Sequence, residues 1–113
     1  MTAENGADSV VRLKPGVRLR SQACLSEVVV VRAGSAPVEL RCGGYPMVGY
    51  DAPAGELREL RPGFDGGNHL GKRYVSAAGT GLEVLVTKAG AGTLADGDVR
   101  LAVKEAKPLP SSD

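Results

Sequence analysis

The sequence predicts an all-β protein, a small antiparallel β-sandwich or barrel with a long glycine-rich loop region. Short runs of β-branched or alternating apolar residues recur along the chain, as is typical of strands that are half-buried in a sheet. Sixteen glycines are spread among these runs, about twice the average share, and they indicate many turns. No segment shows the periodicity of a long amphipathic helix.

The chain has the length of one domain, with 113 residues of which 42% are hydrophobic. We expect a flexible N-terminal tail over residues 1–9, a single β domain over residues 10–110 and a polar tail over residues 111–113. The first residues lack the apolar segment of a signal peptide. No apolar run approaches the roughly 20 residues that span a membrane. The expected compartment is the cytoplasm, where cysteines are kept reduced.

The N-terminal part of the domain predicts two strands. Residues 10–13 are expected to form a short first strand, and Lys14-Pro15-Gly16 is a turn signal. The next residues, 17–21, alternate between apolar and polar side chains, with Val17 and Leu19 on the inward face.

The most strand-like stretch lies between the two cysteines, Cys24 and Cys42. Residues 28–31 are four consecutive valines, and residues 38–42 alternate with the period of a half-buried strand. Gly34 and Pro37 supply turn chemistry between them, which predicts an antiparallel hairpin. In that hairpin the cysteines lie about 13 Å apart along the strands. A disulfide therefore requires a bulge, a bend or a change of sheet.

Residues 43–81 show weaker patterns. Residues 55–61 fit one helical turn or a short strand equally well, and residues 74–77 fit a short strand. A loop-rich region of this length either has a function or contains short strands that the pattern does not reveal.

The C-terminal third predicts two strands, residues 82–88 and 99–104, joined by a longer hairpin loop over residues 89–98. Inward-facing residues of all these strands form the expected core: Val17, Leu19, Val28, Val30, Val38, Leu40, Leu82, Val84, Val86, Val99, Leu101 and Val103.

Charge and composition argue against several classes of partner. The net charge is +1, and the basic residues alternate with acidic ones, so neither nucleic acid nor an acidic membrane surface is expected. The chain has no Trp, one Phe and three Tyr, which is poor material for stacking nucleic-acid bases.

Two thiols and the single histidine raise the possibility of a metal site. Cys24, Cys42 and His69 match the ligand types of an open zinc site. Asp65 or water would supply a fourth ligand to zinc or iron. Buried free thiols and a disulfide are the alternatives, because small cysteines on strands often belong to the core.

Two glycine-containing segments are further candidates. The loop over residues 64–69 holds Asp65, Asn68 and His69, a combination suited to acid–base chemistry or to an exposed turn in which the polar side chains bond their own backbone. Cys42 leads into Gly43 and Gly44, which is typical of a reactive thiol at a bend or of a strand that ends in a glycine turn.

The sequence favours a small non-enzymatic binding or accessory protein that acts through protein–protein association, with another protein or with itself. Catalytic residue types are few, and Leu85 with Val29 or Val31 is expected on an outer strand face. The alternative is a metal-binding protein or metal-assisted enzyme that uses the cysteines and the histidine. The expected ligand or interface residues are Tyr45, Tyr50, Phe64, Asp65 and Asn68.

Overall fold

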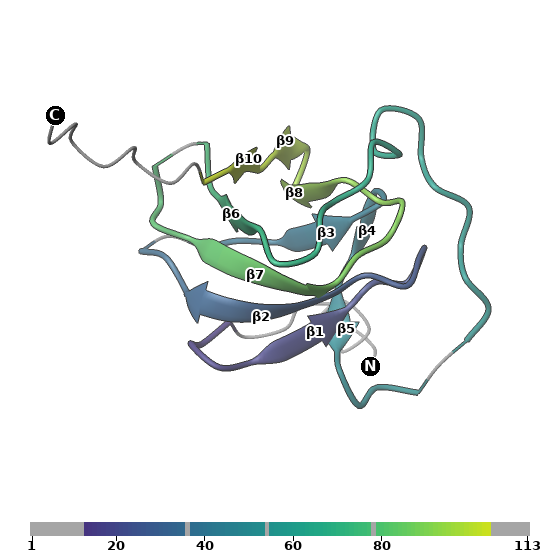
Figure 1. Cartoon of the computed structure of the whole chain (residues 1–113), viewed down its shortest axis with the longest axis horizontal. Helices are drawn as coiled ribbons and strands as arrows, with labels where there is room; N and C mark the ends of the chain where they lie inside the picture. Colours follow the sequence, from purple (N-terminus) through teal and green to yellow (C-terminus); the bar gives the residue numbers. More distant parts are fainter. Residues whose placement is uncertain (1–12, 36, 54, 78, 105–113) are drawn as a thin grey trace, which may run out of the picture.

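The computed structural model describes residues 13–35, 37–53, 55–77 and 79–104. It is all-β: two antiparallel sheets pack on each other as a sandwich, which confirms the predicted all-β class and sandwich architecture (Figure 1). The first sheet contains, in spatial order, β10 (Ala102–Val103), β6 (Arg73–Val75), β7 (Glu83–Lys88), β2 (Glu27–Arg32), β1 (Arg18–Arg20) and β5 (Val48–Gly49). The second contains β4 (Tyr45–Pro46), β3 (Leu40–Cys42), β8 (Leu94–Asp96) and β9 (Val99–Arg100).

The predicted tails, residues 1–9 and 111–113, lie outside the described residues, as do residues 10–12 of the expected first strand. Within the described ranges no helix is long and apolar enough to cross a membrane.

The two longest strands, β2 and β7, form the centre of the larger sheet. They pair antiparallel, with Val28 opposite Val86 and Val30 opposite Val84, and all four side chains are buried. Alternation turns Val29 and Leu85 to the outer face, where they are direct cross-strand partners and half-buried. The β-branched run therefore forms a strand because both of its faces have apolar neighbours.

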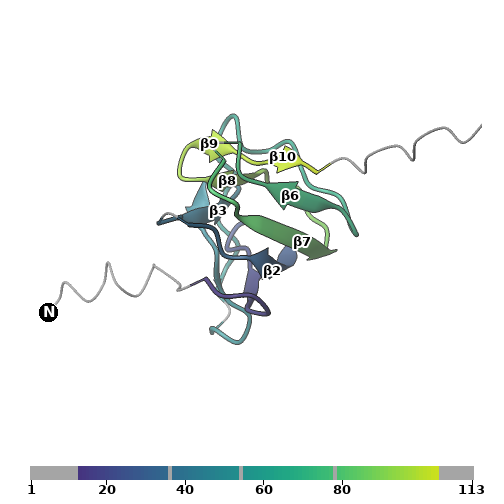
Figure 2. The same cartoon turned by 90° about the vertical axis from the view of Figure 1, so that its left-hand side faces the viewer.

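The core is close to the predicted one. Ten of the twelve expected residues are buried or partly buried, but Val99 is 53% exposed and Val103 is 37% exposed. Both valines lie on terminal strands, since β9 ends the smaller sheet and β10 ends the larger one. Figure 2 shows these two strands following one another along an edge of the sandwich. Leu101, between them, points inward and is 8% exposed.

The predicted hairpin between residues 28–31 and 38–42 is wrong. β2 pairs with β1 and β7, whereas β3 pairs with β4 and β8 in the other sheet. The chain thus changes sheets between β2 and β3. Turn residues between two strands are compatible with either a hairpin or a sheet crossing, and the pairing depends on β7 and β8, which lie far away in the sequence.

The predicted C-terminal hairpin is also wrong. β7 lies between β2 and β6, and residues 89–98 are more than a loop because they contain β8. β8 forms a tight hairpin with β9 through Gly97 and Asp98. The glycine there has φ +58°, a conformation that favours a residue without a side chain.

Residues 43–81 contain three short strands, β4, β5 and β6. Between β5 and β6 the described residues form neither helix nor strand, so residues 55–61 adopt neither of the two predicted structures. Figure 1 shows this connection swinging out beside the sheets before it returns across the smaller sheet. Backbone hydrogen bonds attach its second half: Arg58 N–H donates to the Gln22 carbonyl, and Arg61 N–H donates to the Gly43 carbonyl.

One carboxylate is buried in the larger sheet. Glu83 is 3% exposed and accepts hydrogen bonds from Arg73 at 3.1 Å and Lys104 at 3.2 Å. Burial alone would raise the pKa of Glu83, but the two cationic donors outweigh it and lower the pKa below the ordinary value. The ion pairs thus attach β10 and β6 to β7.

Candidate functional site

The two cysteines meet between the sheets. Cys24 lies in the connection between β1 and β2, and Cys42 is the last residue of β3. Both side chains are buried, and their sulfur atoms are 3.7 Å apart. The separation of about 13 Å expected from a hairpin is therefore wrong, because the change of sheet folds the β3 end back onto the β1–β2 connection.

Polar groups surround the Cys24 sulfur. The hydroxyls of Ser21 and Ser26 lie 3.5 and 3.1 Å from it, and the backbone N–H of Gly92 donates to it at 3.3 Å. Ser21 also accepts hydrogen bonds from the backbone N–H groups of Ala23 and Cys24, which fixes the loop around its side chain. A cysteine that served only as core would have apolar neighbours in these positions.

Asn68 ties three segments together beside the thiols. It is 6% exposed, and its amide nitrogen donates to Ser26 Oγ at 2.7 Å and to the Gly92 carbonyl at 2.8 Å. Its amide oxygen accepts from the Gly90 N–H at 3.2 Å. Asn68 therefore fixes Ser26 and the 90–92 loop, two of the groups that contact the Cys24 sulfur.

The 90–92 loop packs its backbone directly on the sulfurs. A side chain at Gly92 would place its first carbon 2.7 Å from the Cys42 sulfur, and one at Gly90 would lie 2.8 Å from the Cys24 sulfur. Carbon and sulfur atoms do not approach so closely, so these two positions require glycine.

The two thiols share their protons unequally. The hydrogen bond with Cys42 lowers the pKa of Cys24 well below that of an ordinary cysteine, and the hydroxyls of Ser21 and Ser26 act in the same direction against the opposing effect of burial. The pKa of Cys42 is raised by the same hydrogen bond with Cys24, by burial and by repulsion from the negative charge of the Cys24 thiolate. The pair thus loses its first proton readily and its second with difficulty.

The remaining predicted metal ligands do not join the thiols. Within the described part of the chain, no three His, Cys, Asp or Glu side chains form a group that could hold a metal ion. His69 is exposed, and its backbone N–H donates to the Tyr74 hydroxyl at 3.0 Å; Asp65 is exposed as well. The zinc or iron hypothesis for Cys24, Cys42 and His69 stays a prediction.

A second cluster lies on the smaller sheet and the long connection beside it. We call it the arginine–aromatic face, and it consists of Arg41, Tyr45, Arg58, Arg61, Phe64 and Arg100. Arg58 and Arg61 lie over the Tyr45 ring, with 5.2 and 4.8 Å between guanidinium carbon and ring centroid. Arg100 lies 5.7 Å from the Phe64 centroid. These distances are within the range of cation–π interactions.

The backbone beneath this face is fixed. Cys42 and Tyr45 close a two-residue turn in which Gly43 and Gly44 have φ of +70° and +96°, as a type I′ hairpin requires. The Arg61 side chain covers Gly44, where an added carbon would lie within 2.8 Å of it. A hollow of about 260 Å³ opens between Arg61, Phe64 and their neighbours, and Asp98 also lines it.

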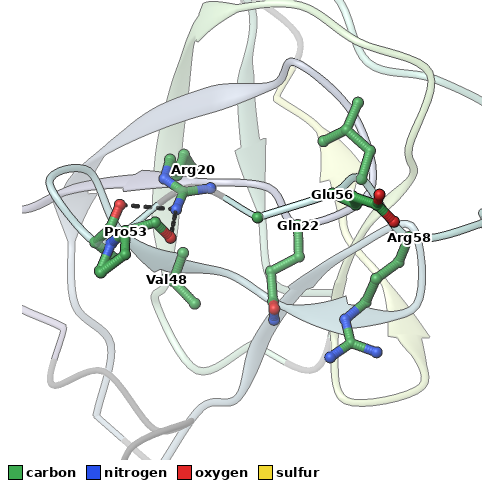
Figure 3. A pocket seen from close by; sticks show the side chains of 9 residues that line it. Arg20, Gln22, Val48, Pro53, Glu56 and Arg58 are labelled. Carbon is green, nitrogen blue, oxygen red and sulfur yellow. Dashed lines mark hydrogen bonds between the residues drawn. The ribbon is translucent and has the colours of Figure 1, made fainter.

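Two further arginines, Arg18 and Arg20, have structural roles. Tyr50, predicted as an interface residue, lies under Arg18 at 3.8 Å. Arg20 lines a wider hollow of about 560 Å³ beside the long connection, but Figure 3 shows its guanidinium turned toward Pro53. It donates to the carbonyls of Ala52 and Pro53 at 2.8 and 2.6 Å, so it attaches the connection to β1.

Sequence reasoning missed the residues that organise the thiols. Ser21, Ser26 and Gly92 carry no metal-site or catalytic motif. Asn68 was predicted as a ligand or interface residue in its own loop, without a connection to the thiols. The one local signal is the spacing of Ser21, Cys24 and Ser26, which brings two hydroxyls to the same thiol once the loop closes.

Comparison with known proteins gives no match: no family model, no curated protein and no solved structure matches the chain.

Proposed function

We propose that the protein is a non-enzymatic binding protein whose arginine–aromatic face binds an acidic segment of a protein partner. One observation carries the proposal. Arg58, Arg61 and Arg100 lie over aromatic rings, and among the described residues none of the three has a carboxylate within ion-pair distance. Arg100 already donates to the Gly63 carbonyl at 3.0 and 2.8 Å, so Arg58 and Arg61 carry the proposal. Within the described part of this face, Arg41 is the one arginine that is paired with a carboxylate, that of Glu39 at 2.9 Å.

The chemistry of the face suits a carboxylate-bearing partner. A guanidinium group binds a carboxylate through two parallel hydrogen bonds, and a ring beneath it leaves its edge free to donate. Stacking holds the long arginine side chains in place, which lowers the entropy that binding costs. Arginine, tyrosine and phenylalanine are also enriched at the centres of protein interfaces.

The outer strand face that the sequence favoured is a weaker candidate. Val29 and Leu85 do lie together there, but both are half-buried, with Arg18 and Arg73 at the neighbouring positions of the same row. The apolar surface they offer is small compared with that of a specific interface.

The experiment measures binding of a fluorescent oligoglutamate peptide by anisotropy, with an oligolysine peptide as the opposite-charge probe. The double variant R58Q/R61Q is expected to bind oligoglutamate at least about tenfold more weakly, since each charge-assisted pair contributes on the order of 1 kcal/mol. K72Q/K88Q is the matched control. It removes the same charge from exposed lysines of the larger sheet and is expected to retain the affinity within about twofold.

Equal weakening in the two double variants would refute the proposal, because it would show attraction by net charge alone. Sedimentation at high concentration tests the source of the acidic segment. If the wild-type protein forms an oligomer and R58Q/R61Q is a monomer, the partner is a second copy of the chain. If the wild-type protein is a monomer, the acidic segment belongs to a different protein.

A further inference from the structure

We propose that Cys24 and Cys42 are a redox-active pair: a peroxide oxidises Cys24, and Cys42 then closes a disulfide that links the two sheets. The inference is independent of the binding face. It is based on two buried sulfurs 3.7 Å apart, one of which has polar contacts on several sides.

The two thiols have different roles because their surroundings differ. Cys24 is 9% exposed and lies in a loop, whereas Cys42 is 0% exposed on β3, so Cys24 is the more accessible of the two sulfurs to a peroxide. The Gly92 N–H donates to the Cys24 sulfur, and the Ser26 hydroxyl, whose oxygen accepts from Asn68, is placed to donate to it as well. The pKa of Cys24 is lowered, chiefly by the hydrogen bond with Cys42. The thiolate is the nucleophile in thiol chemistry.

The reaction balances in two steps. The Cys24 thiolate attacks one peroxide oxygen and the O–O bond breaks, which gives a sulfenic acid and releases hydroxide when hydrogen peroxide is the oxidant. The Cys42 sulfur then attacks the Cys24 sulfur. The S–O bond breaks, and the leaving hydroxide takes the Cys42 proton to form water. The two sulfurs lose two electrons, and these reduce the peroxide.

The first step also prepares the second. A Cys24 thiolate repels negative charge on Cys42 and raises the pKa of that thiol. Conversion of Cys24 to a neutral sulfenic acid removes the repulsion, so Cys42 deprotonates more easily when its partner is oxidised. The order of oxidation is therefore fixed by the pair itself.

Bond formation needs only a local movement. A disulfide has a length of about 2.05 Å, so the sulfurs must approach each other by about 1.7 Å from their present 3.7 Å. Gly90 and Gly92 place only backbone against the sulfurs, so a small rotation of the Cys24 side chain toward Cys42 meets no side chain at these two positions.

The test begins with wild-type protein reduced and then freed of reductant. After treatment with hydrogen peroxide, the intact mass is expected to fall by two hydrogen atoms, and neither cysteine should be alkylated in denaturant. A Cys42→Ser variant has no second thiol, so a sulfenic acid should accumulate on Cys24 and be trapped by dimedone. A Cys24→Ser variant should retain an unmodified Cys42 thiol.

Wild-type protein that keeps two free thiols, at peroxide concentrations that oxidise the urea-unfolded chain, would overturn the proposal. So would disulfides formed only between molecules, or a native mass spectrum in which one metal ion occupies both sulfurs. The wild-type mass decides the question even if a cysteine variant fails to fold.

Discussion

Replacing Asn68 with alanine is the sharpest test of how the thiol pair is held. The side chain makes three hydrogen bonds, at 2.7, 2.8 and 3.2 Å, and it is 6% exposed. With alanine at position 68, the Ser26 hydroxyl, the Gly92 carbonyl and the Gly90 N–H each lose this hydrogen-bond partner. Because the site is buried, water replaces the lost partner poorly. At about 1 kcal/mol for each lost bond, N68A should lower the free energy of unfolding by about 3 kcal/mol.

The assay is urea unfolding in the presence of reductant, so that both cysteines stay thiols. The midpoint should fall while the m-value stays constant, because the amount of surface exposed on unfolding barely changes. Asp65→Ala is the matched control from the same loop. Asp65 is exposed, and the variant is expected to lie within about 0.5 kcal/mol of wild type. A cost of N68A below about 1 kcal/mol would refute the reasoning, since the network would then be replaceable by water.

A double-mutant cycle locates the effect. Ser26→Ala removes one of the three partners of Asn68 and should cost about 1 kcal/mol. The double variant should cost less than the sum of the two single variants by a similar amount, because the same hydrogen bond is lost in both. Additive losses would mean that the Asn68 amide and the Ser26 hydroxyl contribute independently.

Three further predictions concern other parts of the fold. Glu83→Gln should lower the free energy of unfolding by about 1–2 kcal/mol at neutral pH. Because the pKa of Glu83 is lowered in the folded state, the stability advantage of wild type should be fully present above the unfolded-state pKa and should disappear as the pH falls through the folded-state pKa. Urea titrations of both proteins at several pH values measure this difference. Gly92→Ala should destabilise by about 2 kcal/mol because the new carbon meets the Cys42 sulfur and the neighbouring backbone, whereas Gly55→Ala, in open space, should be nearly neutral. A Cys24–Cys42 disulfide closes a loop between positions that are 18 residues apart, so it should raise the free energy of unfolding by about 3 kcal/mol. Equal urea midpoints for the oxidised and the reduced protein would contradict this prediction.

The sequence was most informative where side chains alternate. Inward-facing residues such as Leu19, Leu40 and Val84 were identified because a strand with one face on a core has a period of two, whatever it pairs with. Val99 and Val103 follow the same pattern but are exposed, since they lie on edge strands and alternation does not reveal where a strand lies in a sheet.

Pairing could not be predicted, and the candidate site depends on pairing. The stretch between the cysteines satisfies every local rule for a hairpin, yet β2 pairs with β7 and β3 pairs with β8. The hairpin separates the cysteines, whereas the sheet crossing brings them together. Asn68 shows the same limit, because only the packing of its loop against residues 90–92 turns an ordinary loop residue into a buried one.

The thiol pair and the arginine–aromatic face meet at the turn that follows β3. Gly43 directly follows Cys42, its carbonyl accepts the Arg61 N–H at 3.0 Å, and a side chain there would lie within 3 Å of both Ala23 and Leu60. Any part of the closure that moves β3 toward Cys24, in addition to the rotation of the Cys24 side chain, therefore shifts the backbone on which the face is built. The affinity for oligoglutamate should differ between dithiol and disulfide forms by more than about twofold, measured by anisotropy before and after peroxide. The Cys24→Ser variant, which has no partner for a disulfide, should show no change. Equal affinities in both wild-type forms would show that the side chain of Cys24 takes up the whole movement and that the two sites are independent.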